Sequence, residues 1–275
     1  MPAFPLSEFF LLSGLAVFGA AAILPYAFAL NREKLAGAKM SLPVLALLSF
    51  VQSAVIMAIA VGLGLLAAPP VGLGAPYIQA ALAGEPAPAS FVQILPLAIG
   101  LGALSFAAVA LFERFIFGPH VPEALRVSDV NAKPWARFLA SFYGGLDEEI
   151  LFRLFLVSAL VWILGRFWQG ANGLPADGAY WTAIITSAVL FGLGHLPATQ
   201  ALTPLTPMLV ARAVVLNSLV GIACGWLYWK YGLESAMVAH FSADILLHLI
   251  GPYFVSHIYK DGPKTQVEGA GRSDQ

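Results

Sequence analysis

Long apolar stretches, interrupted by few charged residues, dominate the first half of the chain. No charged residue lies between Glu8 and Arg32, between Lys39 and Glu85, or between Glu85 and Glu113. Because a helix of about 20 mainly apolar residues crosses a bilayer core, each of these intervals can hold at least one membrane span. The stretches are continuous and rich in Ala, Leu and Gly, without the alternation of a barrel strand, so they predict helices.

The same pattern over the whole chain predicts an all-α transmembrane helix bundle of seven to eight spans in a single domain, 1–275. Between the helices lie an Ala-, Gly- and Pro-rich loop at 69–90, with a short helix at 77–83, and a polar linker at 118–133. The polar residues 260–275 are expected to be disordered. The long helices are expected at 8–30, 42–68, 91–117, 135–167, 179–196, 207–230 and 234–258.

Basic residues gather in alternate loops and orient the predicted bundle. The loops after the first and third helices and the C-terminal tail carry most of them, whereas the loop after the second helix carries none. Because cytoplasmic loops are enriched in Lys and Arg, we expect the N-terminus outside and the C-terminus inside. An eighth short or re-entrant helix would change this orientation. The orienting residues are Arg32, Lys34, Lys39, Arg126, Lys133, Lys260, Lys264 and Arg272.

Small residues predict one close contact between helices. Gly221 and Gly225 form a G-x-x-x-G pair on the sixth expected helix. Small residues at this spacing allow two helix backbones to approach each other in a membrane. We therefore expect ordinary close helix packing at this pair.

Composition supports a membrane protein and excludes several other classes. Of 275 residues, 59% are hydrophobic and only 11% are charged, which is too little charge to cover the surface of a soluble domain. The net charge of -1 gives no sign of nucleic-acid binding. Cys224 is the single cysteine, so an intrachain disulfide is impossible.

Ionisable residues inside the apolar helices are the candidates for chemistry, because such groups are costly in a membrane and usually face a cavity or one another. The fourth helix carries Asp147, Glu148, Glu149 and Arg153. Glu149 and Arg153 are four residues apart and share a face, so a salt bridge between them is expected. Glu148 points about 100° away and is left free for another role.

Two further helices carry imidazoles. The fifth helix ends at His195, and the seventh carries His240 and Asp244 four residues apart on one face, with His248 a further turn along. Together with Glu148, these side chains are compatible with two chemistries. They are competent zinc ligands, and they could equally polarise a water for metal-free hydrolysis. The chain has no H-E-x-x-H motif, so the common zinc-protease arrangement is absent.

The order of these motifs resembles the three-motif signature of the CAAX-protease and bacteriocin-processing family, also labelled Abi, which includes the type II CAAX endopeptidases. The similarity covers roughly 138–249, and the stretch 221–240 is similar to the family's lead into its third motif. The first three helices carry no recognisable signature. The motifs are Glu148-Glu149-x-x-x-Arg153, Phe191-x-x-x-His195 and His240-x-x-x-Asp244.

The resemblance implies a role for each matched residue. Glu148 is expected to be the general base that activates water, assisted by His195. Glu149 and Arg153 are expected to form a supporting pair, and His240 and the residue at 244 to bind the oxyanion. It also implies family-variable helices at 1–117, a catalytic four-helix core at 135–258, and no cofactor.

Asp244 departs from the pattern of the animal and archaeal enzymes, which usually carry Asn at this position. An ionised Asp accepts hydrogen bonds and cannot donate one to an oxyanion. Asp244 is therefore protonated, orients His240, or binds a metal. The last alternative is a zinc site formed by Glu148, His195, His240 and Asp244.

The predicted function is that of an intramembrane endopeptidase in a bacterial inner membrane. Its substrate is expected to be a membrane-associated or lipid-anchored peptide or protein, and its other partner the lipid bilayer. The Ala- and Gly-rich composition favours a bacterial source. Two alternatives stay open: a proton-coupled transporter with Glu148, His195 and His240 as its relay, and a catalytically idle membrane scaffold.

The expected topology conflicts with this site in one respect. If the fifth and seventh helices both run from outside to inside, His195 lies near the inner face and His240 near the outer part. At about 1.5 Å of rise per residue, such a separation exceeds hydrogen-bonding distance. Shifted boundaries, tilt or a broken helix would be needed to bring the two imidazoles together.

Overall fold

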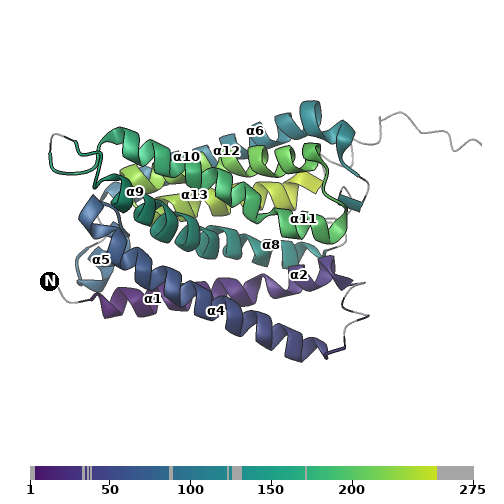
Figure 1. Ribbon diagram of the computed structural model, residues 1–275. Helices are drawn as coiled ribbons and strands as arrows, with labels where there is room; N and C mark the ends of the chain where they lie inside the picture. The colour runs from purple at the N-terminus through teal and green to yellow at the C-terminus, as the bar shows by residue number, and fades with distance from the viewer. Residues whose placement is uncertain are drawn as a thin grey trace, which may run out of the picture.

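The computed structural model of the chain is all-helical, as predicted, and describes residues 4–32, 35, 37, 39–86, 89–122, 124–125, 132–170 and 172–252. The helices lie side by side along one long axis (Figure 1). The N-terminus and the short helix α5 (Pro76–Leu82) lie at the left end of this view, and α11 (Leu196–Leu202) at the right end. The tail 260–275, which we expected to be disordered, lies outside the described residues.

The first expected helix is interrupted. It forms α1 (Leu6–Ala22) and α2 (Leu24–Leu30), which meet at Ile23. Pro25 lies in the first turn of α2, where a missing backbone N–H is tolerated, and in a continuous helix the same residue would remove a hydrogen bond. The helix expected at 8–30 is therefore present as one candidate span, Leu6–Leu30, with a break at Ile23.

The next two expected helices are present. α4 (Leu42–Ala67) is followed by a 3-10 turn, η1 (Pro69–Val71), and by α5, which confirms the short helix expected in the 69–90 loop. α6 (Ala89–Phe112) continues into a π-helical turn, η2 (Glu113–Phe117), and a 3-10 turn, η3 (Gly118–His120).

The fourth helical segment has an unusual winding. It begins with α8 (Pro134–Phe142), passes through two π-helical stretches, η4 (Tyr143–Glu148) and η5 (Ile150–Val157), and ends with α9 (Ser158–Leu164). π-Helical turns inside α-helices are rare and frequently lie at functional sites. Here they cover the part of the helix that carries the predicted acidic motif.

The C-terminal half contains three long segments. α10 (Asp177–Gly194) is followed by α11, a short helix in a stretch that the sequence analysis treated as a connection. α12 (Pro207–Tyr231) and α13 (Leu233–Ile245) are separated by Gly232 alone, whose φ of 92° favours glycine. α13 continues into the π-helical turn η6 (Leu246–Ile250).

Six helices of the described chain are long and apolar enough to cross a membrane, so the protein is a multi-pass membrane protein. The fourth segment is not among them, and it carries the ionisable residues of the first motif. The six candidate spans are Leu6–Leu30, Leu42–Ala67, Ser90–His120, Asp177–Leu202, Pro207–Tyr231 and Leu233–Ile250.

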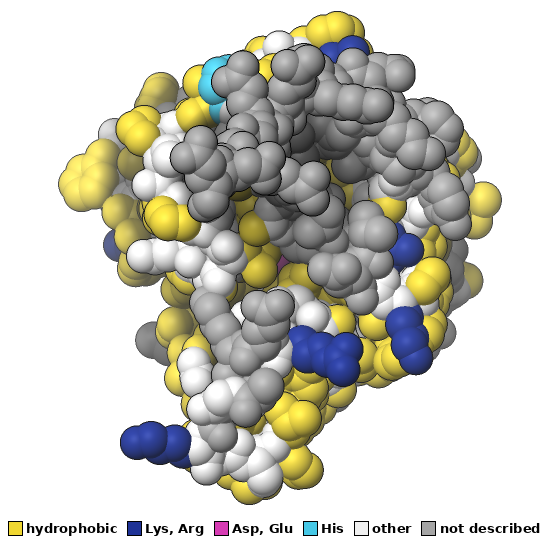
Figure 2. All heavy atoms as spheres, turned by 90° about the vertical axis from the view of Figure 1, so that its right-hand side faces the viewer, with side chains coloured by type: hydrophobic (Ala, Val, Ile, Leu, Met, Phe, Trp, Pro, Cys, Tyr) yellow, Lys and Arg dark blue, Asp and Glu magenta, His cyan; other side chains and the backbone are white. Residues whose placement is uncertain are grey.

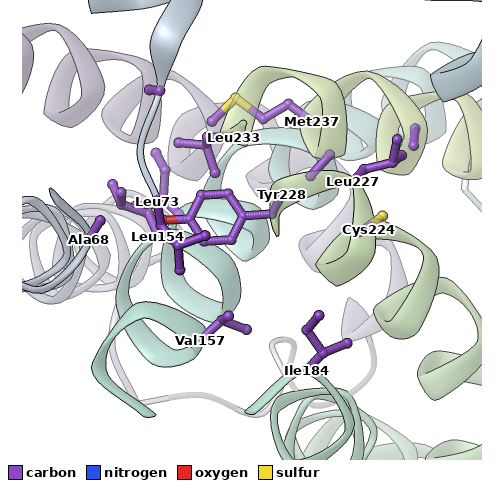
Figure 3. Close-up of a cluster of buried hydrophobic side chains, with 14 of the residues drawn as sticks. Ala68, Leu73, Leu154, Val157, Ile184, Cys224, Leu227, Tyr228, Leu233 and Met237 are labelled. Atoms are coloured by element: carbon purple, nitrogen blue, oxygen red, sulfur yellow. The ribbon is translucent and has the colours of Figure 1, made fainter. Parts of the chain in front are cut away.

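A buried apolar cluster joins the two halves of the bundle. Tyr228 lies at its centre, with Leu154, Leu233 and Met237 around it (Figure 3). The Tyr228 hydroxyl lies 2.7 Å from the Ser158 hydroxyl, so the one polar atom of this ring is paired. This cluster packs η5, α12 and α13 against one another.

Close glycine contacts set the spacing of α10 and α12. A Cβ built on Gly221 would lie 2.9 Å from the Ala188 Cβ, and one built on Gly225 would lie 2.7 Å from Ile184 Cγ2. The two helices can approach this closely only because neither position carries a side chain. The packing role expected for the G-x-x-x-G pair is therefore confirmed.

Candidate active site

Glu149 and Arg153 form the buried base of the site. Both side chains are almost fully buried, and Arg153 Nη1 lies 3.0 Å from Glu149 Oε1, which confirms the predicted salt bridge. Arg153 Nη2 also donates to the carbonyl oxygen of Gly221 at 3.2 Å. The guanidinium lies over the Phe191 ring, 5.2 Å from its centroid. The fourth helix is thereby fixed to α10 and α12.

His240 is oriented by this buried pair. Its Nδ1 lies 2.6 Å from Glu149 Oε1, so the N–H at Nδ1 donates to the carboxylate. Its Nε2 then faces two other carboxylates, at 3.6 Å from Glu148 Oε2 and 3.7 Å from Asp244 Oδ1. Carboxylates that fix one imidazole nitrogen in this way determine what the other nitrogen presents.

His195 meets the same glutamate from the opposite side. Its Nε2 lies 3.8 Å from Glu148 Oε1, and its Nδ1 lies 2.9 Å from the carbonyl oxygen of Phe191. Because a carbonyl only accepts, Nδ1 carries a hydrogen and Nε2 faces Glu148. Both imidazoles therefore present Nε2 to the carboxylate of Glu148.

The expected separation in depth between His195 and His240 was wrong. Side chains on a helix point back toward its N-terminus, and the contact with the Phe191 carbonyl folds the His195 ring back by one turn. The ring thus lies deeper in the bundle than the backbone of residue 195. Glu148, between the two imidazoles, spans the remaining distance.

Phe191 separates and supports the two imidazoles. Its ring lies nearly perpendicular to both, with centroid distances of 4.7 Å to His195 and 5.7 Å to His240. It is 2% exposed, so its position is fixed by packing. Phe191 is the first residue of the second motif, but its type and position in the sequence indicate no role.

Two glycines at the start of the π-helical stretch allow this convergence. A Cβ on Gly144 would overlap the Asp244 carboxylate and lie 3.3 Å from His240 Nε2. A Cβ on Gly145 would lie 3.0 Å from the Phe241 Cβ. Both residues were missed by the sequence analysis, although a Gly-Gly pair just before an acidic motif is a signal of close backbone approach.

The convergent side chains line a cavity of about 570 Å³. Apolar residues from both halves of the chain form much of its wall, among them Ile23, Phe106 and Val109. An ion pair between Arg212 Nε and Glu113 Oε2, 2.8 Å apart, lies in the wall as well. Figure 2 looks along the bundle from its right-hand end, where Lys and Arg side chains lie among hydrophobic ones.

A family comparison agrees with this geometry. Residues 130–246 match the family described as type II CAAX prenyl endopeptidase Rce1-like. The chain contains an Rce1-like domain. This domain spans all three motifs, and the family is one of proteases, so the predicted resemblance and enzyme class are confirmed. Searches of curated proteins and of solved structures gave no match.

Of the three consecutive acidic residues 147–149 in the Rce1-like domain, Asp147 does not join the site. It is 1% exposed and faces Gly19 of α1, away from the two imidazoles. Neither of its oxygens has a hydrogen-bond partner in the described part of the chain. No catalytic role was predicted for Asp147.

Zinc binding by the Rce1-like domain is compatible with the predicted donors. Glu148 lies 3.8 Å from His195 and 3.6 Å from His240, and His240 lies 3.7 Å from Asp244, whereas donors on one tetrahedral zinc lie about 3.3 Å apart. Each imidazole also uses Nδ1 on an oxygen, as histidines that bind metals usually do. These four residues do not form a group whose ligand atoms all lie within 4.8 Å of one another, so the chemistry of the donors, and not their spacing, is what suits a metal.

A second group of metal-competent atoms lies deeper in the domain. Glu149, Cys224 and His240 offer ligand atoms within 4.8 Å of one another, all buried. Glu149 Oε1 and His240 Nδ1 are, however, already paired with each other at 2.6 Å. Cys224 was not predicted to be near the site, because nothing in the spacing along the sixth helix indicates which face carries it.

Proposed function

We propose that this protein is an intramembrane endopeptidase that hydrolyses a peptide bond in a membrane-associated or lipid-anchored peptide or protein. The observation that carries the proposal is the position of Glu148. Its carboxylate lies between the Nε2 atoms of His195 and His240, at 3.8 and 3.6 Å, on the wall of a largely apolar cavity. These separations exceed a direct hydrogen bond and suit a water shared by the three groups.

In the proposed reaction, Glu148 is the general base. It takes a proton from the water while the oxygen of that water attacks the carbonyl carbon of the scissile bond. The carbonyl π electrons move to oxygen, and the C–N bond breaks when the nitrogen receives the proton from Glu148. His195 holds the water through Nε2. A positioned base of this kind contributes about 10²- to 10⁴-fold to a rate.

The buried pair below Glu148 serves as a positioning device. Glu149 fixes the Nδ1–H of His240, and Arg153 compensates the charge of Glu149. Asp244, four residues after His240, is proposed to orient its Nε2. Of the three roles considered for Asp244, this one requires neither a protonated carboxyl nor a metal.

The substrate class follows from the surroundings of the site. The cavity is bounded by candidate membrane spans, and its wall is mainly apolar. A substrate segment held there is in contact with the membrane or anchored to it.

The six candidate spans and the fourth helical segment, α8 to α9, together suggest the topology. We infer that the chain crosses the membrane seven times, with the N-terminus outside. The basic residues at the right-hand end of the bundle support a cytoplasmic assignment for that end, in a bacterial inner membrane.

A zinc-dependent form of the same reaction is the second candidate, supported by the chemistry of the donors. Glu148, His195, His240 and Asp244 would hold the ion, which would supply Lewis-acid polarisation of the scissile carbonyl. The roles of Glu149 and Arg153 would be unchanged, because they act on His240 Nδ1 and not on Nε2.

A cleavage assay on the purified full-length chain in lipid vesicles tests the proposal. Membrane-anchored peptides serve as substrates, with wild type compared with Glu148→Gln, His195→Ala and His240→Ala, each with and without a chelator. Loss of cleavage in each variant and resistance to chelation are expected. If cleavage is lost on chelation and recovers when zinc is added, the zinc-dependent mechanism replaces the metal-free one. Cleavage by Glu148→Gln at the wild-type rate would overturn the proposed function.

A further inference from the structure

Tyr143 lines the catalytic cavity, and the mechanism above does not use its hydroxyl. It is the first residue of η4, is half-buried, and lines the cavity together with Glu148. Its hydroxyl makes no hydrogen bond to any described residue, and it is not among the fully enclosed polar atoms. The hydroxyl is therefore available to a molecule in the cavity.

The π-helical winding places Tyr143 and Glu148 on the same face of the helix. In an α-helix, residues five apart point about 140° away from each other. In a π-helix, whose hydrogen bonds join residue i to i+5, such residues lie one above the other on the same face. Tyr143 and Glu148 are five apart and begin and end η4. The next such pair, Gly144 and Glu149, behaves in the same way, because both face His240.

Beyond His240, the motif residues provide no second donor for the oxyanion of the proposed reaction. The tetrahedral intermediate carries a negative oxygen that must receive hydrogen bonds. Asp244 occupies the position expected to donate, yet an ionised carboxylate only accepts. Arg153 is engaged with Glu149 and with the Gly221 carbonyl. A phenol is a neutral donor at physiological pH and is one of the side chains that form oxyanion holes.

We propose that Tyr143 is a catalytic residue that donates a hydrogen bond to the oxyanion. This inference rests on the proposed peptidase function and extends it. When the oxygen of the Glu148-activated water bonds to the carbonyl carbon, the carbonyl oxygen becomes the oxyanion facing the Tyr143 O–H. The phenolic proton stays on Tyr143 throughout. When the C–N bond breaks, the oxygen again becomes a carbonyl, and the leaving nitrogen takes its proton from Glu148.

The test compares Tyr143→Phe with wild type in the vesicle cleavage assay, using a membrane-anchored peptide as substrate. Removal of one oxyanion donor is expected to lower kcat by about 10²- to 10³-fold with KM unchanged. Tyr77→Phe is the control. It removes a hydroxyl from α5, at the opposite end of the bundle, and should leave kcat unchanged. Unfolding midpoints of both variants establish whether folding has changed.

A second substitution separates donation from packing. Asp244→Asn introduces an amide donor at the neighbouring position. In the Tyr143→Phe background it should restore part of kcat, which a space-filling role of the phenol would not allow. Wild-type kcat in Tyr143→Phe, or a loss that follows the unfolding midpoint and is not rescued, overturns the inference. If Glu148→Gln is inactive in the same assay, the proposed function survives that outcome.

Discussion

At the scale of single residues, two adjacent carboxylates of the same helix have opposite surroundings. Glu148 faces the cavity and two imidazoles, whereas Asp147 faces Gly19 of α1 and is buried. We expect Glu148→Gln, which preserves shape and removes the base, to lower kcat at least about 100-fold. Asp147→Asn is the matched control and should cleave at close to the wild-type rate. Initial rates of peptide cleavage measure both, and equal losses would show that the site is misassigned.

The buried ion pair below the site makes a prediction about stability. Glu149 and Arg153 are 0% and 1% exposed, so removal of either charge leaves the other uncompensated. Breaking a buried pair in this way costs about 3–5 kcal/mol. Glu149→Gln should therefore lower the unfolding midpoint of the protein strongly, as followed by thermal denaturation in detergent.

The half-exposed pair of Arg212 and Glu113 provides the comparison for that experiment. Its side chains are 28% and 18% exposed, so water screens the interaction. Exposed pairs contribute about 0.2–1 kcal/mol. Glu113→Gln should shift the midpoint only slightly, and a shift as large as that of Glu149→Gln would argue against a special role for the buried pair.

Residue types and spacing, together with the family resemblance, selected the groups that converge. The structure brings together all six residues selected from the sequence, although their catalytic roles stay predictions. Phe191 and Gly144 were harder to find because their contribution is shape. A ring between two imidazoles and a missing Cβ beside Asp244 become visible only when the helices are packed.

At the scale of helices, the π-helical stretch is the feature with the clearest consequence. It places Gly144 against the carboxylate of Asp244, where no side chain fits. We expect Gly144→Ala to displace Asp244 and His240 and to lower kcat at least about tenfold, with the protein still folded. Gly100→Ala is the control, because a Cβ there meets nothing within 4 Å and alanine favours a helix. Cleavage rates and far-UV circular dichroism check the pair.

Hydropathy predicted the long helices but not their winding. The approximate bounds of α4, α6 and α12 follow from the length of their apolar runs. The interruption at Ile23, the short helix α11 and the π-helical turns depend on backbone hydrogen bonds that hydropathy does not encode. An α-helical projection separates Tyr143 from Glu148, so the sequence could not bring the phenol into the site.

At the scale of the whole molecule, the protein reverses the usual distribution of charge. Large apolar side chains such as Phe10, at 68% exposed, and Leu47, at 60%, cover the outside, whereas the ion pair of Glu149 and Arg153 lies inside. This distribution suits a lipid environment, in which an apolar exterior has no cost and an interior charge must be paired. A lipid-facing exterior explains why the first half of the chain is strongly apolar and has no recognisable motif.

The cavity wall gives that first half a part in the function, which leads to a prediction outside the Rce1-like domain. Val109 on α6 is 8% exposed and lines the cavity, although it precedes residues 130–246. Val109→Trp should occupy space needed by the substrate and lower kcat/KM at least about tenfold, chiefly through KM. Val92→Trp, at a position of the same helix that is 70% exposed, adds the same bulk outside the cavity and should have little effect. Steady-state cleavage kinetics distinguish the two. Equal kinetics in both variants would mean that the substrate contacts only the C-terminal helices, so that α6 encloses the site without shaping it.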